Sequence, residues 1–286
     1  FGVQLVAYDD ELEPAVANQR ARELILDRQV VAVLGHLTRG VAEAVRSVYA
    51  AAGIPFLSFA PGEADGLAPR LFPAERAWTA TIVEQTARHI IGRRVALVAV
   101  ERLDCIQMAE AMADALARGG WSVVARANVH DRALRFADVV DRLRPARPDL
   151  VVFSGLPDQG TSLAEQFGSA LPTAWILGLG PPDCPEWKHV AGGARVLTLR
   201  LRWSPPQDTD GFLGRYRRTT GEEATAFAAL GYDAVRQVLD AALEAPNRAG
   251  IAAVLERRTQ PTGQLPLGPA WLSPMIQVSQ AGDRTT

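Results

Sequence analysis

Short apolar runs alternate with amphipathic stretches from the start of the chain to about Leu201. This alternation predicts a parallel β-sheet with helices on both faces. The apolar runs predict strands at Val3–Tyr8, Val30–Leu34, Pro55–Ser58, Val95–Val100, Ser122–Ala127, Leu150–Phe153, Ala174–Leu177 and Arg195–Leu201. The amphipathic stretches predict helices at Glu13–Arg28, Thr38–Ala52, Glu75–Ile91, Asp104–Arg118, Ala133–Arg144, Asp158–Ser169 and Asp183–Val190.

Beyond Pro205 the pattern changes to consecutive helical stretches. They predict helices at Asp208–Thr219, Ala224–Glu244 and Ala249–Arg257. A Gly/Pro-rich tail follows, with a weak final strand near Met275–Val278.

Three segments between these elements are candidate crossings between two lobes. A helix ends in glycine within Ile91–Arg94, a Pro-Pro loop occupies Leu201–Pro206, and a third break lies near Thr259–Thr262. The prediction is a lobe I of residues 1–91 plus 206–258 and a lobe II of residues 94–201 plus 262–286. Several linkers acting together form a hinge, and ligands of such sheets bind outside the carboxyl ends of the strands.

The predicted first lobe contains three clear βα units. Doubly wound sheets usually have about five strands or more. We therefore expect this lobe to lack the leading βα unit of the fold.

Composition narrows the class of protein. The chain has 286 residues, of which 48% are hydrophobic and 22% charged, with a net charge of -2. A sizeable core is expected, and the absence of clustered positive charge argues against a nucleic-acid partner. No apolar stretch approaches the ~20 residues of a membrane helix. The chain opens on Phe1 without a signal peptide, as expected for a mature form or a fragment.

Sequence signatures of catalysis are scarce. There is no Walker phosphate loop, no G-x-S-x-G elbow and no H-E-x-x-H motif. Gly178-Leu179-Gly180 follows a strand but lacks the third glycine of a dinucleotide site. His36 follows a strand on the presumed ligand side, where a polar lining role is favoured over catalysis. We predict no enzymatic activity, no cofactor and no metal.

Two further features leave alternatives open. Cys105 and Cys184 allow one disulfide or two free thiols, and a helix N-terminus near Cys105 makes a reactive thiol conceivable. Asp9-Asp10 suggests either a metal site or, as we interpret it, the cap of the following helix.

The order of motifs resembles the leucine/isoleucine/valine-binding proteins of ABC importers. The D-D-x-x-x-P opening at Asp9–Pro14, the turn Gly35–Gly40 and the Gly53-Ile54-Pro55 strand have counterparts in that family. Pro148–Val152 resembles the second lobe, and Gly231-Tyr232-Asp233-Ala234-Val235 resembles a returning helix. The resemblance implies a type I periplasmic binding fold.

The resemblance also implies where a ligand binds. In the family, a carboxylate meets a Ser hydroxyl and amides at the turn, and an acid of the other lobe holds an ammonium. Here Arg39 stands at the Ser position, Gly62 at a Thr position and Gly180 at the acid position, with Asp183 nearby. Asp104-Cys105 replaces the usual Tyr-Gly. These departures favour a small organic anion whose carboxylate pairs with Arg39.

The predicted function is a periplasmic or extracellular solute receptor of an ABC importer. It is expected to bind a small amino-acid-like or organic-acid ligand, which bears a carboxylate, in the inter-lobe cleft and to deliver it to the membrane permease. The predicted ligand-binding residues are Arg39, Gly40, Phe59, Ala60, Gly62, Asp104, Leu156, Gly180 and Phe227. One alternative is a sensory or regulatory domain with the same bilobed fold. Others are a repurposed cleft in which Arg39 points to solvent, and a hydrolase that depends on Cys105.

Overall fold

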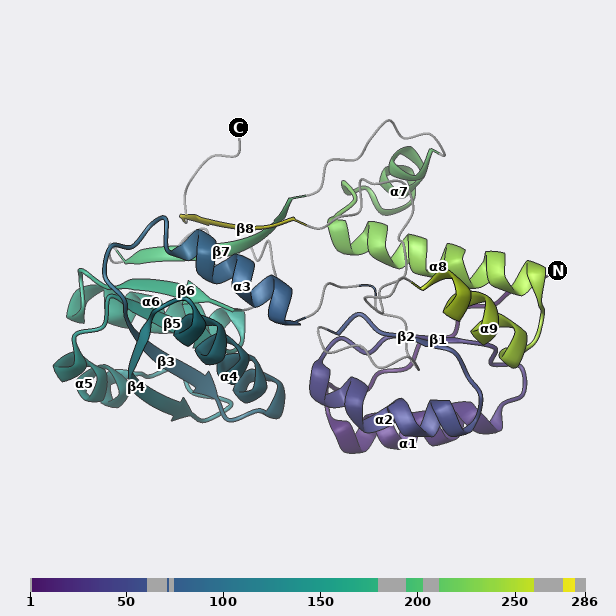
Figure 1. Cartoon of the computed structure of the whole chain (residues 1–286), viewed down its shortest axis with the longest axis horizontal. Coiled ribbons are helices and arrows are strands. Elements are labelled where there is room, and N and C mark those ends of the chain that lie inside the picture. Colours follow the sequence, from purple (N-terminus) through teal and green to yellow (C-terminus); the bar gives the residue numbers. More distant parts are fainter. Residues whose placement is uncertain are drawn as a thin grey trace. The chain divides into compact units, whose positions relative to one another are not determined.

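A computed structural model describes residues 2–60, 71, 75–179, 194–202, 211–259 and 275–280. The chain divides into two compact units, each of α/β architecture (Figure 1). Unit 1 comprises Phe1–Ala74 and Trp203–Pro274, and unit 2 comprises Glu75–Arg202 and Met275–Thr286. Each unit is therefore discontinuous in sequence. Within the described residues, no helix is both long enough and apolar enough to cross a membrane.

Unit 2 contains a six-stranded sheet in the order β4-β3-β5-β6-β7-β8. All pairs are parallel except β7 with β8, which are antiparallel. The strands are β3 (Arg94–Val100), β4 (Ser122–Val129), β5 (Leu150–Ser154), β6 (Trp175–Gly178), β7 (Arg195–Arg202) and β8 (Met275–Gln280). The C-terminal strand thus closes one edge of a sheet built mainly from the middle of the chain.

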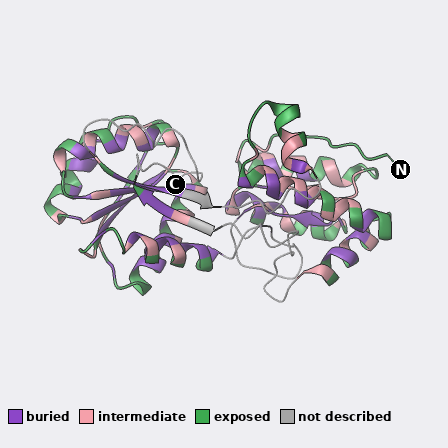
Figure 2. Ribbon diagram, turned by 90° about the horizontal axis from the view of Figure 1, so that it is seen from above, coloured by how far each residue is buried: buried purple, intermediate pink, exposed green. Residues whose placement is uncertain are grey.

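Helices cover both faces of this sheet (Figure 2). They are α3 (Glu75–Thr86), α4 (Leu103–Arg118), α5 (Ala137–Leu143) with a 3-10 turn at Arg144–Ala146, and α6 (Pro157–Ala170). Every residue of β5 is buried, and so is every residue of β3 after Arg94. In one hydrophobic core, Val98 of β3 and Phe153 of β5 pack together with Val140 of α5 and Phe167 of α6. Burial on both faces explains why these strands are continuous apolar runs.

Unit 1 is organised around two short parallel strands, β1 (Val33–Leu34) and β2 (Phe56–Leu57). Its helices are α1 (Pro14–Leu26), α2 (Arg39–Ala51), α7 (Phe212–Thr220), α8 (Ala226–Glu244) and α9 (Arg248–Arg258). Successive residues of β2 point to opposite faces. Phe56 packs in the core made with α1 and α2, and Leu57 packs in the core made with α8 and α9.

Arg248, the first residue of α9, links this helix to the connection between α1 and β1 by hydrogen bonds. Its Nε donates to the carbonyl of Val30 at 2.8 Å, and its Nη atoms donate to the carbonyls of Ile25 and Asp27. The carbonyl of Ile25 lies in the last turn of α1, where helix carbonyls have no partner within the helix. Arg248 therefore joins segments more than two hundred positions apart and fixes the approach to β1.

The predicted strand at Val3–Tyr8 is wrong. The segment forms no strand, and Val3, Leu5, Val6 and Tyr8 are each at least half exposed. An alternating apolar pattern satisfies the periodicity of a strand, but a strand also needs a neighbour. In the described part of unit 1, β1 pairs with β2 and not with this segment.

The helix predicted at Ala133–Arg144 begins later, at Ala137. Two side chains of α6 supply hydrogen bonds that the preceding loop would otherwise find in a helix. The amide of Gln159 donates to the carbonyls of Asp131 and Ala133, at 3.0 and 3.2 Å. Gln166 accepts from the backbone N–H of Phe136 at 2.7 Å. Long-range side-chain contacts therefore stabilise a loop where the sequence pattern indicated a helix.

The first boundary between units also differs from the expected one. Residues 75–91 were assigned to lobe I, whereas α3 belongs to unit 2. The helix packs on α4, and Gln85 accepts a hydrogen bond from the backbone N–H of Val278 in β8 at 2.7 Å. The crossing therefore precedes Glu75 and does not fall at Ile91–Arg94.

Three predicted features lie outside the described residues: the helix at Asp183–Val190, the loop at Trp203–Pro206 and most of the break at Thr259–Thr262. The other predicted strands and helices are present, with ends shifted by a few residues. The expected α/β fold class is confirmed.

The core of unit 2 offers a test of the packing. Phe153 is fully buried, whereas Ile91 is fully exposed. We expect Phe153→Ala to lower the free energy of unfolding of this unit by about 3–5 kcal/mol because a cavity replaces a close-packed ring. Ile91→Ala, the control, should change it by less than about 0.5 kcal/mol. Urea unfolding followed by tryptophan fluorescence measures both. Equal effects of the two substitutions would contradict this assignment of the core.

Candidate functional site

The carboxyl ends of β1 and β2 lie side by side in unit 1. The strands pair in register, Val33 with Phe56 and Leu34 with Leu57. Because the strands are parallel, the residues that follow each of them emerge at the same edge. The turn from Gly35 to Gly40 and the segment Ser58–Ala60 are therefore neighbours, as the resemblance implied.

The turn after β1 leads directly into α2. Gly35 has a φ of 148°, a conformation that residues with a Cβ rarely adopt. Thr38 is the N-cap, but its side chain makes no capping hydrogen bond. Within the part of the chain that the structure describes, Thr38 Oγ1 is buried and has no hydrogen-bond partner. The first turn of α2 carries no acidic residue to offset the positive end of the helix dipole.

Arg39 and Gly40 are the first two residues of α2. Gly40 is buried, and the Arg39 side chain is 37% exposed. The Nε of Arg39 donates to Glu43 Oε1 at 2.7 Å, one helical turn later. Such an exposed pair stabilises a helix by only about 0.3–0.5 kcal/mol.

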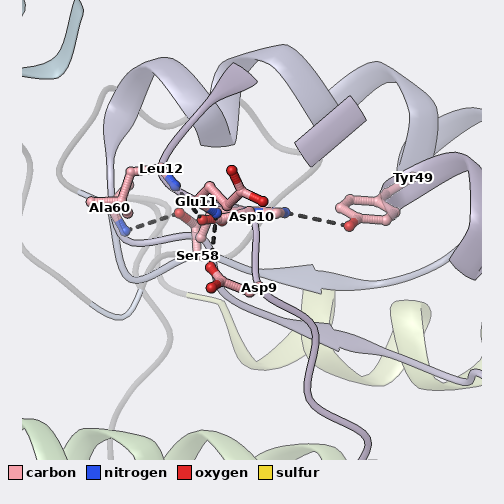
Figure 3. Close-up of polar contacts among 8 residues, drawn as sticks. Asp9, Asp10, Glu11, Leu12, Tyr49, Ser58 and Ala60 are labelled. Atoms are coloured by element: carbon pink, nitrogen blue, oxygen red, sulfur yellow. Dashed lines mark hydrogen bonds and ion pairs between the residues drawn. The ribbon is translucent and has the colours of Figure 1, made fainter. Parts of the chain in front are cut away.

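The segment after β2 contributes backbone and small side chains. Ala60 is buried and Phe59 is half-buried. The backbone N–H of Ala60 donates to Ser58 Oγ at 3.0 Å, so the Ser58 side chain holds this loop closed (Figure 3). Gly62 lies outside the described residues.

His36, within the turn, takes part in buried hydrogen bonds that the sequence did not predict. His36 is 8% exposed, and its Nδ1 is 2.5 Å from Asp10 Oδ2. Its Nε2 is 3.3 Å from the hydroxyl of Tyr49, on α2 (Figure 3). Burial, aided by the negative charge of Asp10, raises the pKa of Tyr49 to about 12. The hydroxyl therefore stays neutral at physiological pH.

The interpretation of Asp9-Asp10 as a helix cap is wrong. The N-cap of α1 is Glu13, which makes no side-chain cap. Asp9 and Asp10 instead accept from the backbone N–H groups of Glu11 and Leu12, at 2.8 and 2.9 Å (Figure 3). Both acceptor contacts stabilise a tight loop in which Glu11 and Leu12 have φ values of 54° and 55°. Such left-handed conformations are costly for residues with side chains, so the two carboxylates hold a strained segment.

Unit 2 presents an equivalent edge, formed by the carboxyl ends of the paired strands β3 and β5. Asp104 lies in the first turn of α4, 3.3 Å from the Nε of Arg102, and Leu156 is the N-cap of α6. Leu103 and Leu156 are exposed there by 51% and 41%. Leu103 was not predicted; its place after a strand end was the available signal. Gly180 and Asp183 lie outside the described residues.

Cys105 follows Asp104 in α4 and carries a free thiol that is 8% exposed. Burial, with Asp104 second, raises the pKa of this thiol to about 12 despite its place near a helix N-terminus. The thiolate fraction at neutral pH is therefore small, which does not favour a nucleophile. Cys184 lies outside the described residues.

Phe227, the last candidate, is the second residue of α8 in unit 1 and is 38% exposed. Among the described residues, no group of three or more His, Cys, Asp or Glu side chains is arranged to hold a metal ion.

The chain belongs to the periplasmic binding protein family, whose model matches residues 2–281. The fold is that of type I periplasmic binding proteins, and the family is one of solute-binding proteins. No curated protein matches the sequence significantly.

Solved structures with this fold include transporter binding proteins with different ligands. LivJ of Streptococcus pneumoniae in complex with isoleucine has a TM-score of 0.73 at 18% identity, over 97% of this chain and 87% of LivJ. The leucine-binding protein LivK of Thermotoga maritima has a TM-score of 0.72 at 18% identity, over 90% of this chain and 77% of LivK. A solute-binding protein of an R. palustris ABC transporter in complex with benzoate has a TM-score of 0.71 at 17% identity, over 96% and 81%. Identities this low establish the fold alone.

The buried thiol gives a direct prediction. In a Cys184→Ser background, we expect iodoacetamide to label Cys105 of the folded protein at pH 8 roughly a hundredfold or more slowly than the urea-unfolded chain, because both burial and the raised pKa suppress the thiolate. Mass spectrometry of timed samples measures both rates. Comparable rates would show that Cys105 is accessible and ionised, and would revive a nucleophilic role.

Proposed function

We propose that this protein is the solute receptor of an ABC importer and binds a small organic acid with an apolar body. Its partner is then a membrane permease, and its location the periplasm or the extracellular face. The observation that carries this proposal is the N-terminal turn of α2. It combines Arg39, helix amides without a side-chain cap, and a buried Thr38 hydroxyl that has no hydrogen-bond partner among the described residues.

The chemistry of that turn fits a carboxylate. Helix N-termini attract anions because N–H groups and the helix dipole point toward them. Arg39 adds a guanidinium suited to bidentate pairing with a carboxylate. Isoleucine and benzoate, the ligands of two structural relatives, both carry a carboxylate.

The strand edge of unit 2, formed by the carboxyl ends of β3 and β5, favours a ligand with an apolar body and no free ammonium. Leu103 and Leu156 expose aliphatic side chains at the carboxyl ends of adjacent strands. Asp104 lies beside Arg102, whose charge already offsets that of its carboxylate. A ligand ammonium would have to compete with this arginine. We therefore propose that Asp104 and Leu156 contact the apolar part of an aromatic or aliphatic acid. Gly180, which lies outside the described residues, stays an expected contact.

In unit 1 the proposed contacts are the amide of Gly40, beside Arg39, and the neighbouring residues Phe59 and Ala60. Gly62, which lies outside the described residues, stays an expected contact. Phe227 is a peripheral member of the proposed set. A thermal-shift screen over aromatic acids, aliphatic acids and amino acids identifies the ligand, since a tight ligand raises the melting temperature by mass action. A screen in which only amino acids stabilise the protein would contradict the proposed class.

Arg39 is the residue to substitute. We expect Arg39→Ala to weaken the best acid of the screen by roughly tenfold or more, because a charge-assisted hydrogen bond is worth ~1.5–3 kcal/mol. Arg39→Lys should recover part of the loss, since an ammonium cannot reproduce the planar fork. Arg22→Ala, which removes an exposed arginine from α1, is the control. Calorimetric titration measures all four proteins, and unchanged affinity in Arg39→Ala would exclude Arg39 from the site.

A further inference from the structure

His36 connects the proposed anion-binding turn to two other segments of unit 1. Its Nδ1 lies 2.5 Å from Asp10 in the loop before α1, and its Nε2 lies 3.3 Å from Tyr49 near the end of α2. The edge of its ring packs against Phe56 of β2, with 5.7 Å between ring centroids. Loop, turn, helix and strand therefore meet at one buried imidazole.

We propose that Asp10, His36 and Tyr49 are positioning residues of the proposed site: they hold the Gly35–Gly40 turn rigid. This inference rests on the proposed function, because the turn is where the carboxylate binds. The three residues act through the turn, whereas Arg39 and Gly40 at its end supply the proposed ligand contacts.

Both protonation states of His36 keep the same geometry. A neutral imidazole donates Nδ1–H to Asp10 and accepts at Nε2 from the Tyr49 hydroxyl, whereas an imidazolium donates to both. Tyr49 can reverse its role because its hydroxyl is neutral and rotates freely. The imidazole therefore links Asp10 to Tyr49 by hydrogen bonds in either state.

The positioning role is tested without a ligand by a matched pair of substitutions. Asp9→Ala and Asp10→Ala each remove one carboxylate that accepts a loop N–H, but only Asp10 contacts His36. Backbone 15N relaxation should show the order parameters of residues 35–40 falling from about 0.85 toward 0.6 in Asp10→Ala. Asp9→Ala should leave them unchanged. Tyr49→Phe, which removes only the hydroxyl, should produce a smaller decrease at the same residues.

The consequence for binding is tested with benzoate as the probe, titrated calorimetrically at one pH. Asp10→Ala should raise the Kd roughly threefold to tenfold, because a mobile turn must be ordered on binding. Asp9→Ala should leave the Kd unchanged. Equal Kd values, or equal order parameters, in Asp9→Ala and Asp10→Ala would overturn the inference. If benzoate does not bind the wild type, the proposed acid class fails for this probe, while the relaxation data still decide the positioning role.

Discussion

The parallel pairing of β1 with β2 is the constraint on which the proposed site depends. Two strands in register, each only two residues long, bring residues 35–40 and 58–60 to one edge although some twenty positions separate them in sequence. The strands are held from both sides, by α1 and α2 on one face and by α8 and α9 on the other. Loss of either helical layer would free β1 and β2 from their packing. The proposed binding site therefore depends on the same residues that form the two cores.

A second constraint is the cost of burying charge. His36 and Asp10 are removed from most solvent, and such groups persist only when hydrogen-bonded to one another. The pair therefore links the loop before α1 to the turn before α2 and makes the position of one depend on the other. Arg248 has a comparable role at the opposite end of β1, where it binds three carbonyls. Polar contacts at both ends thus define where a two-residue strand begins and ends.

Sequence periodicity predicted most elements because each depends on local alternation and on burial, as the continuous apolar runs of β3 and β5 illustrate. It failed where a distant partner decides the structure. Val3–Tyr8 has the pattern of a strand without a neighbour, and the loop before Ala137 is stabilised by Gln159 and Gln166 of another helix. The link between Asp10 and His36 spans 26 positions, and no spacing rule connects them. The turn at Arg39 was found by resemblance, whereas its supporting residues required the structure.

The most direct test of the central claim is a titration of 15N-labelled protein with benzoate, followed by two-dimensional NMR. If a small organic acid binds at the strand edges, saturable shift changes should appear at the amides of Leu37–Gly40 and Ser58–Ala60 in unit 1, and near Leu103 and Leu156 in unit 2. Helix N-terminal amides that approach a carboxylate should show the largest changes. Saturable changes confined to other parts of the chain, with these amides unaffected, would contradict the account.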